Sequence, residues 1–332
     1  LRRLSIIWRI DPAGFCSTPT ADLRNRSALP PNQPPLRSSI RLRAFAKINL
    51  GLRILSRRPD GYHEIRTIYQ TLRLHDRLTL TIDRGGRGIQ VTSKGEDAPS
   101  GRANLVYKAA ELWRRAAPFR GGIEVQIEKF IPAGSGLGGA SSDAAATLAG
   151  LERLTGDLLG ATKQFVLAAR IGSDVPLFLL GGRVLGCGRG QEVYPLEDLD
   201  PAECLVVFPG VKMLTADAYR QASSRLTTRE ELSRIDGFGV WSQRPLNLWG
   251  PAENDFECVV FAKWPELGRL KSQLIRAGAE TACLTGSGSA VYAIFDSPGK
   301  LLQAMRIVPT AWRTFHTQTL NRKTYHRLWG CG

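Results

Sequence analysis

The chain has 332 residues, 43% of them hydrophobic and 23% charged, which is typical of an ordinary globular protein long enough for two domains. No run of about 18 apolar residues occurs, so no membrane span or membrane partner is expected. The net charge of +15 leaves nucleic-acid binding open as a second hypothesis, but the excess gathers at the ends. Residues 1–43 carry eight Arg against two Asp, and residues 301–332 carry five Lys or Arg and no acid. No basic helical stripe with interleaved aromatic residues is seen, so nucleic acid is not predicted as a partner.

The cysteines and histidines are scattered along the chain without C-x-x-C spacing or a ligand cluster, so no protein-held metal is predicted. They are Cys16, Cys187, Cys204, Cys258, Cys283, Cys331, His63, His75, His316 and His326. Scattered cysteines without a secretion signal favour a reducing bacterial cytoplasm.

Residues 1–40 are predicted to be an N-terminal extension, either disordered or spurious. Six prolines break any helix there, and Ser, Arg and Asn dominate the rest. An Arg- and Ser-rich start also occurs in organelle transit peptides, which would place the protein in a plastid. Upstream sequence read from a misplaced start codon is favoured, because prolines do not suit an amphipathic targeting helix.

Ordered structure is predicted to begin near Ile40, with an N-terminal domain over residues 41–195. Alternating apolar residues predict a strand over 43–52, and Pro59-Asp60-Gly61 predicts a turn. Two further strands are expected over 65–72 and 77–83, and a short one at Ile89 and Val91 within a glycine-rich loop region. Residues 104–117 predict a helix with Leu105, Ala109, Leu112 and Ala116 on its buried stripe.

The most informative segment runs Pro132-Ala133-Gly134-Ser135-Gly136-Leu137-Gly138-Gly139-Ala140-Ser141-Ser142-Asp143. It lies between an alternating strand pattern at 123–127 and an alanine-rich helical segment at 144–154. Glycines let the backbone approach a phosphate, and the helix start adds free N–H groups and a positive dipole end. Ser141, Ser142 and Asp143 suit the cap and first turn of this helix.

The alternative for this segment is a tight strand-to-helix connection without a ligand. It is no Walker loop, because no Gly-Lys-Ser/Thr follows. It is also an unconvincing dinucleotide fingerprint, since no acidic residue closes a second strand about 20 residues later.

The remaining elements follow in order. A helix is expected over 162–171, a short apolar strand over 175–180, and a C-terminal domain over residues 196–328 that opens with a strand at 205–208. Residues 222–250 are irregular and polar, and 256–277 largely helical. Residues 283–295 predict a loop and then a strand, and a helix at 301–305 and a strand at 315–320 close the domain.

Two charged residues stand out against apolar surroundings. Alternation places Lys47 and Asn49 on one face of the first strand, where the lysine either meets solvent or enters a cleft to hold a phosphate. Asp174 lies between Gly172 and an apolar segment, where it is either a turn residue or the acceptor of a hydroxyl proton. A carboxylate is a weak base for an alcohol, but it serves in phosphoryl transfer, where orientation and charge dominate.

Two softer motifs accompany them. Tyr62-His63 follows a turn and is either a surface pair or a ring that stacks on a base beside an imidazole that reads its edge. Thr285-Gly286-Ser287-Gly288-Ser289 is either a tight β-connection or a second set of N–H groups that completes a phosphate cradle.

In this order the motifs resemble those of the galactokinase, homoserine kinase, mevalonate kinase and phosphomevalonate kinase superfamily, and within it the family of 4-diphosphocytidyl-2-C-methyl-D-erythritol kinases. The resemblance rests on Ala46-Lys47-Ile48-Asn49-Leu50, Asp60-Gly61-Tyr62-His63, residues 132–142, Gly172-Ser173-Asp174-Val175-Pro176 and residues 284–290. It covers about residues 44–328, and the Asp-Gly-Tyr-His element distinguishes this family from its relatives.

The resemblance implies a two-domain α+β kinase with its active site in the inter-domain cleft. It implies ATP-dependent phosphorylation of the 2-hydroxyl of diphosphocytidyl methylerythritol, in the non-mevalonate route to isopentenyl diphosphate, with Mg²⁺ shielding the phosphates. Asp174 would be the base and Lys47 its partner. Asn104, Lys129 and residues 132–142 would bind ATP. The substrate would be bound by Asn49, Tyr62, His63, Tyr69, Thr215 and Tyr219. A monomer or weak homodimer is expected.

The sequence departs from the family pattern at a few positions. Ala140 replaces a usual glycine of the loop, and Asp143 replaces a usual Asn, so its carboxylate would either repel the phosphates or hold Mg²⁺. Tyr69 and Tyr219 stand where Phe is common.

Overall fold

The computed structural model describes residues 36–95, 99–223 and 252–329. Within these ranges the strands are β1 Arg37–Arg57, β2 His63–Asp83, β3 Ile89–Gly95, β4 Gly122–Lys129, β5 Arg183–Cys187, β6 Glu192–Pro195, β7 Glu203–Phe208, β8 Glu253–Asn254, β9 Thr281–Leu284, β10 Val291–Phe295 and β11 Arg313–Gln318. The helices are α1 Leu105–Ala116, α2 Gly139–Thr155, α3 Gly160–Ile171, α4 Leu177–Leu180, α5 Thr215–Ser223, α7 Glu257–Lys263, α8 Pro265–Arg276, α9 Pro298–Met305 and α10 Arg322–Trp329, with a 3-10 turn at Gly101–Ala103.

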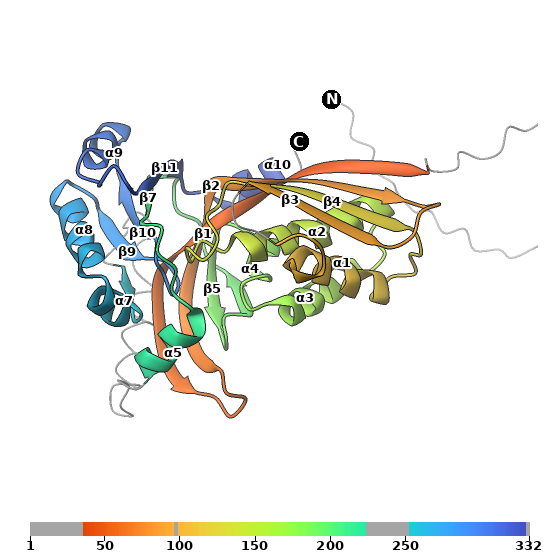
Figure 1. Ribbon diagram of the computed structural model, residues 1–332, viewed down its shortest axis with the longest axis horizontal. Coiled ribbons are helices and arrows are strands. Elements are labelled where there is room, and N and C mark those ends of the chain that lie inside the picture. Colours follow the sequence, from red (N-terminus) through yellow and green to blue (C-terminus); the bar gives the residue numbers. More distant parts are fainter. Residues whose placement is uncertain (1–35, 96–98, 224–251, 330–332) are drawn as a thin grey trace, which may run out of the picture. The chain divides into compact units, whose positions relative to one another are not determined.

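The described strands form two sheets. The first has seven strands and is built along the order β3-β4-β2-β1-β8, with β5 and β6 attached through β2. Helices α1, α2 and α3 lie along one face of it (Figure 1). Alternation explains the packing, since Leu78, Leu80 and Ile82 of β2 all enter this core.

The second sheet has the order β11-β7-β10-β9. Its two faces serve different cores. Leu205 and Val207 join the core formed with α7, α8 and α9. Their neighbours Cys204 and Val206 join a core that includes Ala46, Ile48 and Leu50 of β1. Because residues of β7 alternate between these two faces, one face of the second sheet packs against β1 of the first sheet.

Strand β1 is therefore the element that positions the site. It pairs with β2 along 21 residues, and the register shifts between Phe45 and Lys47, whose partners are His75 and Thr71. The sequence predicts two strands here, over 65–72 and 77–83, and this is wrong: β2 is continuous, and the interruption is this irregularity in the pairing.

Three other local expectations need correction. The segment 175–180 contains the short helix α4 instead of a strand. Helix α2 begins at Gly139, with Gly138 as a left-handed cap, so Ser141, Ser142 and Asp143 provide no side-chain cap. The buried face of α1 carries Val106, Ala109, Ala110 and Trp113. Of the expected stripe, Ala109 is buried, Leu105 and Leu112 pack half-buried at the edge of this core, and Ala116 is exposed.

Most of the other expected elements are confirmed, with strand β1 beginning at Arg37 and the helical region 256–277 divided at Trp264 into α7 and α8. The strands β5 and β6 and the helices α5 and α10 were not anticipated. Residues 1–35 and most of 222–250 lie outside the described residues. No helix in the described ranges combines the length and the apolar character that crossing a bilayer requires.

Candidate active site

Lys47 and Asp174 meet beside the glycine loop. The Lys47 Nζ lies 3.6 Å from Asp174 Oδ2 and donates a hydrogen bond of 2.6 Å to Asn49 Oδ1. Lys47 is buried, whereas the Asp174 side chain keeps 32% exposure and faces the cavity. Burial lowers the pKa of Lys47, and the Asp174 carboxylate opposes that shift. The pair thus joins a fixed cation to a carboxylate that a ligand can reach.

Hydrogen bonds fix the orientation of both groups. The Tyr69 hydroxyl donates to Asp174 Oδ1 at 3.1 Å. The Asn49 amide donates to Thr67 Oγ1, and Thr285 Oγ1 donates to Asn49 Oδ1 at 3.3 Å. Burial, and then the nearby Asp174 charge, raise the pKa of Tyr69, so this hydroxyl stays a donor at neutral pH.

The two glycine loops meet at this point. The Lys47 backbone N–H donates to the Leu137 carbonyl, and the Ala290 N–H donates to the Ser135 carbonyl. A Cβ on Gly136 would overlap the Thr285 carbonyl oxygen, and Gly286 lies against Gly136 and Lys47. Only glycine permits this approach at the observed positive φ of Gly136. The second loop is thus packed on the first, as a shared phosphate cradle requires.

A cavity of about 790 Å³, which we call the Lys47 pocket, is lined by all six of the expected substrate residues. It is lined by Lys47, Asn49, Tyr62, His63, Tyr69, Asp174, Thr215 and Tyr219, together with Gly134, Gly136, Gly138 and Ser141 of the loop. The His63 and Tyr219 rings are stacked, with centroids 4.8 Å apart. Burial, followed by the Arg57 charge, lowers the pKa of His63, so its imidazole is neutral at pH 7.

A second cavity of about 390 Å³, the loop pocket, shares Gly134, Gly136, Gly138 and Ser141 with the Lys47 pocket. It is lined by Asn104, Lys129, residues 132–141 and Asp143. Asn104 caps α1, accepting from the Val106 N–H at 2.9 Å and donating to the Pro99 carbonyl. Ser142 is buried at the start of α2, and its Oγ has no hydrogen-bond partner among the described residues.

Lys129 is held by two carboxylates. Its Nζ donates to Asp76 Oδ2 and lies 2.7 Å from Asp143 Oδ2, and all three side chains are buried. Burial raises the pKa of Asp143 to about 7, although the neighbouring Lys129 charge opposes the shift. Asp143 therefore pairs with Lys129, an arrangement that the sequence-based alternatives did not include.

Sequence reasoning missed the arginines of the Lys47 pocket, Arg57, Arg189 and Arg220. Arg189 lies in the β5–β6 turn, and its guanidinium carbon is 4.5 Å from the centroid of the Tyr62 ring. The sequence feature that could have indicated Arg189 as a site residue is its position between two glycines, in Gly188-Arg189-Gly190. Asp76 was also missed, because nothing local marks an aspartate in a strand as the partner of a distant lysine.

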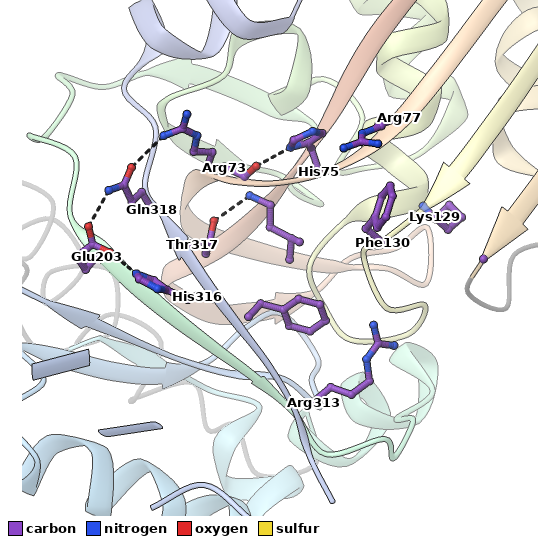
Figure 2. A pocket seen from close by; sticks show the side chains of 13 residues that line it. Arg73, His75, Arg77, Lys129, Phe130, Glu203, Arg313, His316, Thr317 and Gln318 are labelled. Atoms are coloured by element: carbon purple, nitrogen blue, oxygen red, sulfur yellow. Dashed lines mark hydrogen bonds and ion pairs between the residues drawn. The ribbon is translucent and has the colours of Figure 1, made fainter. Parts of the chain in front are cut away.

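A cavity larger than these two, of about 930 Å³, lies between β2 and β11, and of the expected site residues it contacts only Lys129 (Figure 2). It holds neither Lys47 nor Asp174, so the candidate chemistry belongs to the two smaller pockets. Within the described residues, no group of three or more His, Cys, Asp or Glu side chains could hold a metal ion.

The sequence of this chain matches two kinase domain families and several named relatives. Residues 104–182 match the model for the GHMP kinases N terminal domain, and residues 241–314 match that for GHMP kinases C terminal. A protein of Solibacter usitatus named 4-diphosphocytidyl-2-C-methyl-D-erythritol kinase is 42% identical over 294 residues, which cover 87% of this chain and 91% of that protein. A protein of the same name from Pelotomaculum thermopropionicum is 35% identical over 283 residues, covering 85% and 97%.

Solved structures agree with the sequence comparison. A crystal structure of 4-(cytidine 5'-diphospho)-2C-methyl-D-erythritol kinase superposes with a TM-score of 0.66 at 32% identity, covering 84% of this chain and 99% of that one. Homoserine kinase from Cytophaga hutchinsonii superposes with a TM-score of 0.68 at 19% identity, covering 86% and 96%, which is a likeness of fold alone.

Proposed function

The chain belongs to the GHMP kinase family, and from this premise we propose that it transfers the γ-phosphate of ATP to the 2-hydroxyl of 4-diphosphocytidyl-2-C-methyl-D-erythritol. The observation that carries the proposal is the meeting of Lys47, Asp174 and the glycine loop in one pocket walled by Tyr62, His63 and Tyr219. We further propose that the reaction takes place in the bacterial cytoplasm, and a monomer or weak homodimer remains a prediction.

Asp174 and Lys47 are assigned to the reacting hydroxyl. The oxygen of the substrate 2-hydroxyl forms a bond to the γ-phosphorus of ATP. At the same time the bond between the γ-phosphorus and the β–γ bridging oxygen breaks, and the hydroxyl proton passes to the Asp174 carboxylate. The Tyr69 hydroxyl holds that carboxylate in orientation. The Lys47 ammonium, 3.6 Å from Asp174, opposes the negative charge on the transferring group. Little bond formation to the nucleophile is needed, so positioning and charge supply most of the rate.

The glycine loop and the loop pocket are assigned to ATP. Residues 132–142 would surround the phosphates with backbone N–H groups, and Asn104 and Lys129 would line the nucleotide end. Mg²⁺ is expected to accompany ATP and to neutralise phosphate charge. The unpaired Ser142 Oγ fits this ion, because Mg²⁺ takes hard oxygen ligands and receives most of them from phosphates and water.

Tyr62, His63, Tyr219, Asn49 and Thr215 are assigned to the cytidyl substrate. The ring faces of Tyr62 and Tyr219 would stack on cytosine, and the neutral His63 can both donate and accept along the edge of the base. The stacked rings of His63 and Tyr219 form the part of the pocket wall against which the base would lie.

The experiment that tests the activity is incubation with ATP, Mg²⁺ and the cytidyl substrate, with ADP release as the readout. Homoserine and mevalonate are the matched alternatives, because related kinases act on them. ADP release with the cytidyl substrate alone supports the proposal. Turnover of homoserine or mevalonate without turnover of the cytidyl substrate would reject it.

The assigned roles are tested by Asp174→Asn and Lys47→Met. Each is expected to lower kcat by about a hundredfold or more, because one loses the proton acceptor and the other the transition-state cation. Circular dichroism and the melting temperature confirm that each variant folds. Wild-type kcat in either folded variant would reject that residue's role while leaving the overall activity in place.

A further inference from the structure

Asn254 is a buried amide to which the proposed reaction assigns no role. It lies on β8, whose two residues pair in parallel with Gly51 and Leu52 of β1. Asn254 keeps only 5% exposure and lines neither the Lys47 pocket nor the loop pocket. Because burial of an unpaired amide is unfavourable, the partners of this side chain indicate what it holds in place.

The Asn254 amide spends both of its N–H donors on the second glycine loop. Its Nδ2 donates to the Leu284 carbonyl at 2.9 Å and to the Gly286 carbonyl at 2.8 Å. Its Oδ1 accepts from the Phe256 N–H at 3.0 Å, next to the start of α7. The two carbonyls flank Thr285, so one side chain fixes the first turn of the loop to β8, and through β8 to β1.

The residues that follow Asn254 make this attachment firm. The Asp255 N–H donates to the Leu52 carbonyl at 3.0 Å, and Asp255 Oδ2 accepts from the Ile54 N–H at 2.7 Å. Glu257 Oε1 accepts from the Leu284 N–H at 3.0 Å. The segment is thus bonded to β1 on one side, and Leu284 is held on the other side through both its N–H and its carbonyl.

The peptide that Asn254 holds lies beside Lys47. A Cβ on Gly286 would be 3.4 Å from Lys47 Nζ and 3.3 Å from the Gly136 carbonyl oxygen. Gly286 and Ser287 line the Lys47 pocket, whereas neither lines the loop pocket. The position of Gly286 therefore limits the space around the ammonium assigned to the transferring group, and not the space assigned to the nucleotide.

The same hydrogen bond also orients the next N–H group. In a trans peptide the carbonyl and the following N–H point in opposite directions. Because the Gly286 carbonyl points to Asn254, the Ser287 N–H points away from it, and it donates to no described residue. Since Ser287 lines the Lys47 pocket, this N–H is a donor available to an anionic oxygen there.

We propose that Asn254 is a positioning residue for phosphoryl transfer, which holds the Gly286–Ser287 peptide against Lys47 so that the Ser287 N–H and the ammonium face the transferring group together. The inference rests on the proposed function. Asn254 acts through the loop and contacts neither reactant. A displacement of about 1 Å at a reacting centre can cost about a hundredfold in rate, so the loss of this restraint should appear in kcat.

The test uses Asn254→Asp and Asn254→Ala, with folding checked by circular dichroism. Aspartate keeps the acceptor for the Phe256 N–H but turns a carboxyl group toward two carbonyls, and alanine removes all three bonds. Each variant is expected to lower kcat at least about tenfold, with the KM for ATP within about twofold of wild type.

Amide hydrogen exchange over residues 284–290, followed by mass spectrometry, measures the restraint itself. The N–H groups of Thr285, Gly288 and Ala290 donate within this loop or to the first glycine loop. Their exchange is expected to be faster in both Asn254 variants, because the turn that they close is no longer tied to β8.

The matched controls are Gln70→Glu and Gln70→Ala. Gln70 is buried on β2, its Nε2 donates to the carbonyls of Thr71 at 3.2 Å and Leu320 at 2.7 Å, and it lines neither of the two pockets. The controls therefore remove the same kind of bridge between two carbonyls at a remote position. They should lower the melting temperature but leave kcat and the exchange of residues 284–290 as in wild type.

Three results would each overturn the proposal: wild-type kcat in a folded Asn254 variant, wild-type exchange of the loop in that variant, or an equal loss of kcat in the Gln70 controls. A wild-type protein that releases no ADP with the cytidyl substrate would instead reject the proposed function. The exchange measurement would then still decide whether Asn254 holds the loop.

Discussion

At the scale of single residues, Lys129 has the most consequential surroundings. Asp76 binds it on one side while accepting the N–H groups of Phe130 and Ile131, so one carboxylate fixes both the lysine and the start of the glycine segment. Asp143 binds it on the other side through Oδ2, and Asp143 Oδ1 has no partner in the described part of the chain. Burial raises the pKa of Asp143 to about 7; the Lys129 charge opposes this shift, and the Asp76 charge adds to it.

Replacement of Asp143 by Asn is expected to stabilise the protein more at pH 8 than at pH 5.5. The folded-state pKa of Asp143 is about 7, against an ordinary value of 3.8, so folding takes up a proton between these values. The contribution of Asp143 to stability therefore falls as the pH rises through this window and is least favourable above about 7. Asparagine removes this cost and still accepts from Lys129. The expected gain at pH 8 is on the order of 1–2 kcal/mol, or about 2–5 °C in Tm.

The measurement is thermal unfolding at both pH values in metal-free buffer. Asp76→Asn is the control, and it should lower the Tm at both, because Asp76 Oδ1 accepts two backbone N–H groups and Oδ2 pairs with Lys129. An equal gain for Asp143→Asn at the two pH values would contradict the assigned titration.

Arg189 is expected to bind the diphosphate of the cytidyl substrate. It lines the Lys47 pocket and stacks on Tyr62, the ring assigned to cytosine. Arg189→Gln should raise the KM for the cytidyl substrate about tenfold or more, since a hydrogen bond to a charged group contributes about 1.5–3 kcal/mol. The kcat and the KM for ATP should change little. Steady-state kinetics measures these constants, and Arg189→Lys, which keeps the charge, should lose less. A fall in kcat at unchanged KM would refute this role.

At the scale of elements, the decisive contact is the one between the two glycine loops. The first connects β4 to α2, and the second connects β9 to β10. The Thr285 hydroxyl shares its single proton between Asn49 Oδ1, at 3.3 Å, and the Gly136 carbonyl, at 3.2 Å, and the Thr285 carbonyl lies where a Cβ of Gly136 would be. The proposed phosphate cradle would therefore depend on one loop closing on the other, and each loop connects elements of a different sheet.

Gly136→Ala is expected to lower both the Tm and the affinity for ATP. Gly156→Ala is its matched control, because both glycines have a φ near +80° but a Cβ on Gly156 meets nothing within 4 Å. Both variants carry the backbone strain of about 1–2 kcal/mol. Overlap with the Thr285 carbonyl should cost a further 1–3 kcal/mol, roughly, in Gly136→Ala alone. Thermal unfolding and nucleotide titration measure the two effects, and equal losses in the two variants would show that the loops do not restrain each other.

Prediction of the elements succeeded where the signal was local. The turn at Pro59-Asp60-Gly61 and the end of α3 at Ile171, before Gly172, follow from residue chemistry and are confirmed. Prediction of the elements failed where tertiary packing determines the secondary structure. The segment 175–180 is as apolar as a buried strand, but its backbone forms the helix α4, and Phe178 accepts from the Tyr325 hydroxyl through its carbonyl. Short apolar runs do not distinguish the two structures.

At the scale of the whole molecule, the predicted fold class is confirmed by the GHMP kinase matches and by the solved structures, and the site lies where β1 adjoins both sheets. The Tyr292 hydroxyl of β10 donates to the Asn49 carbonyl of β1, which ties the second sheet to the first. The C-terminal helix α10 returns to the first sheet, with Tyr325 packed on Phe45. The predicted boundary at residues 195 and 196 stays a prediction.

Residue type and short spacing were enough to identify the glycine segment, the lysine on β1, the aspartate after α3 and the order of motifs that relates them to a kinase family. The tertiary structure alone decided that Asp143 pairs with Lys129, that Arg189 faces Tyr62, and that Arg73, Arg77 and Arg313 line the cavity between β2 and β11. Those contacts join residues up to about 240 positions apart, and the pairing of strands and the burial of charge that create them have no local signature.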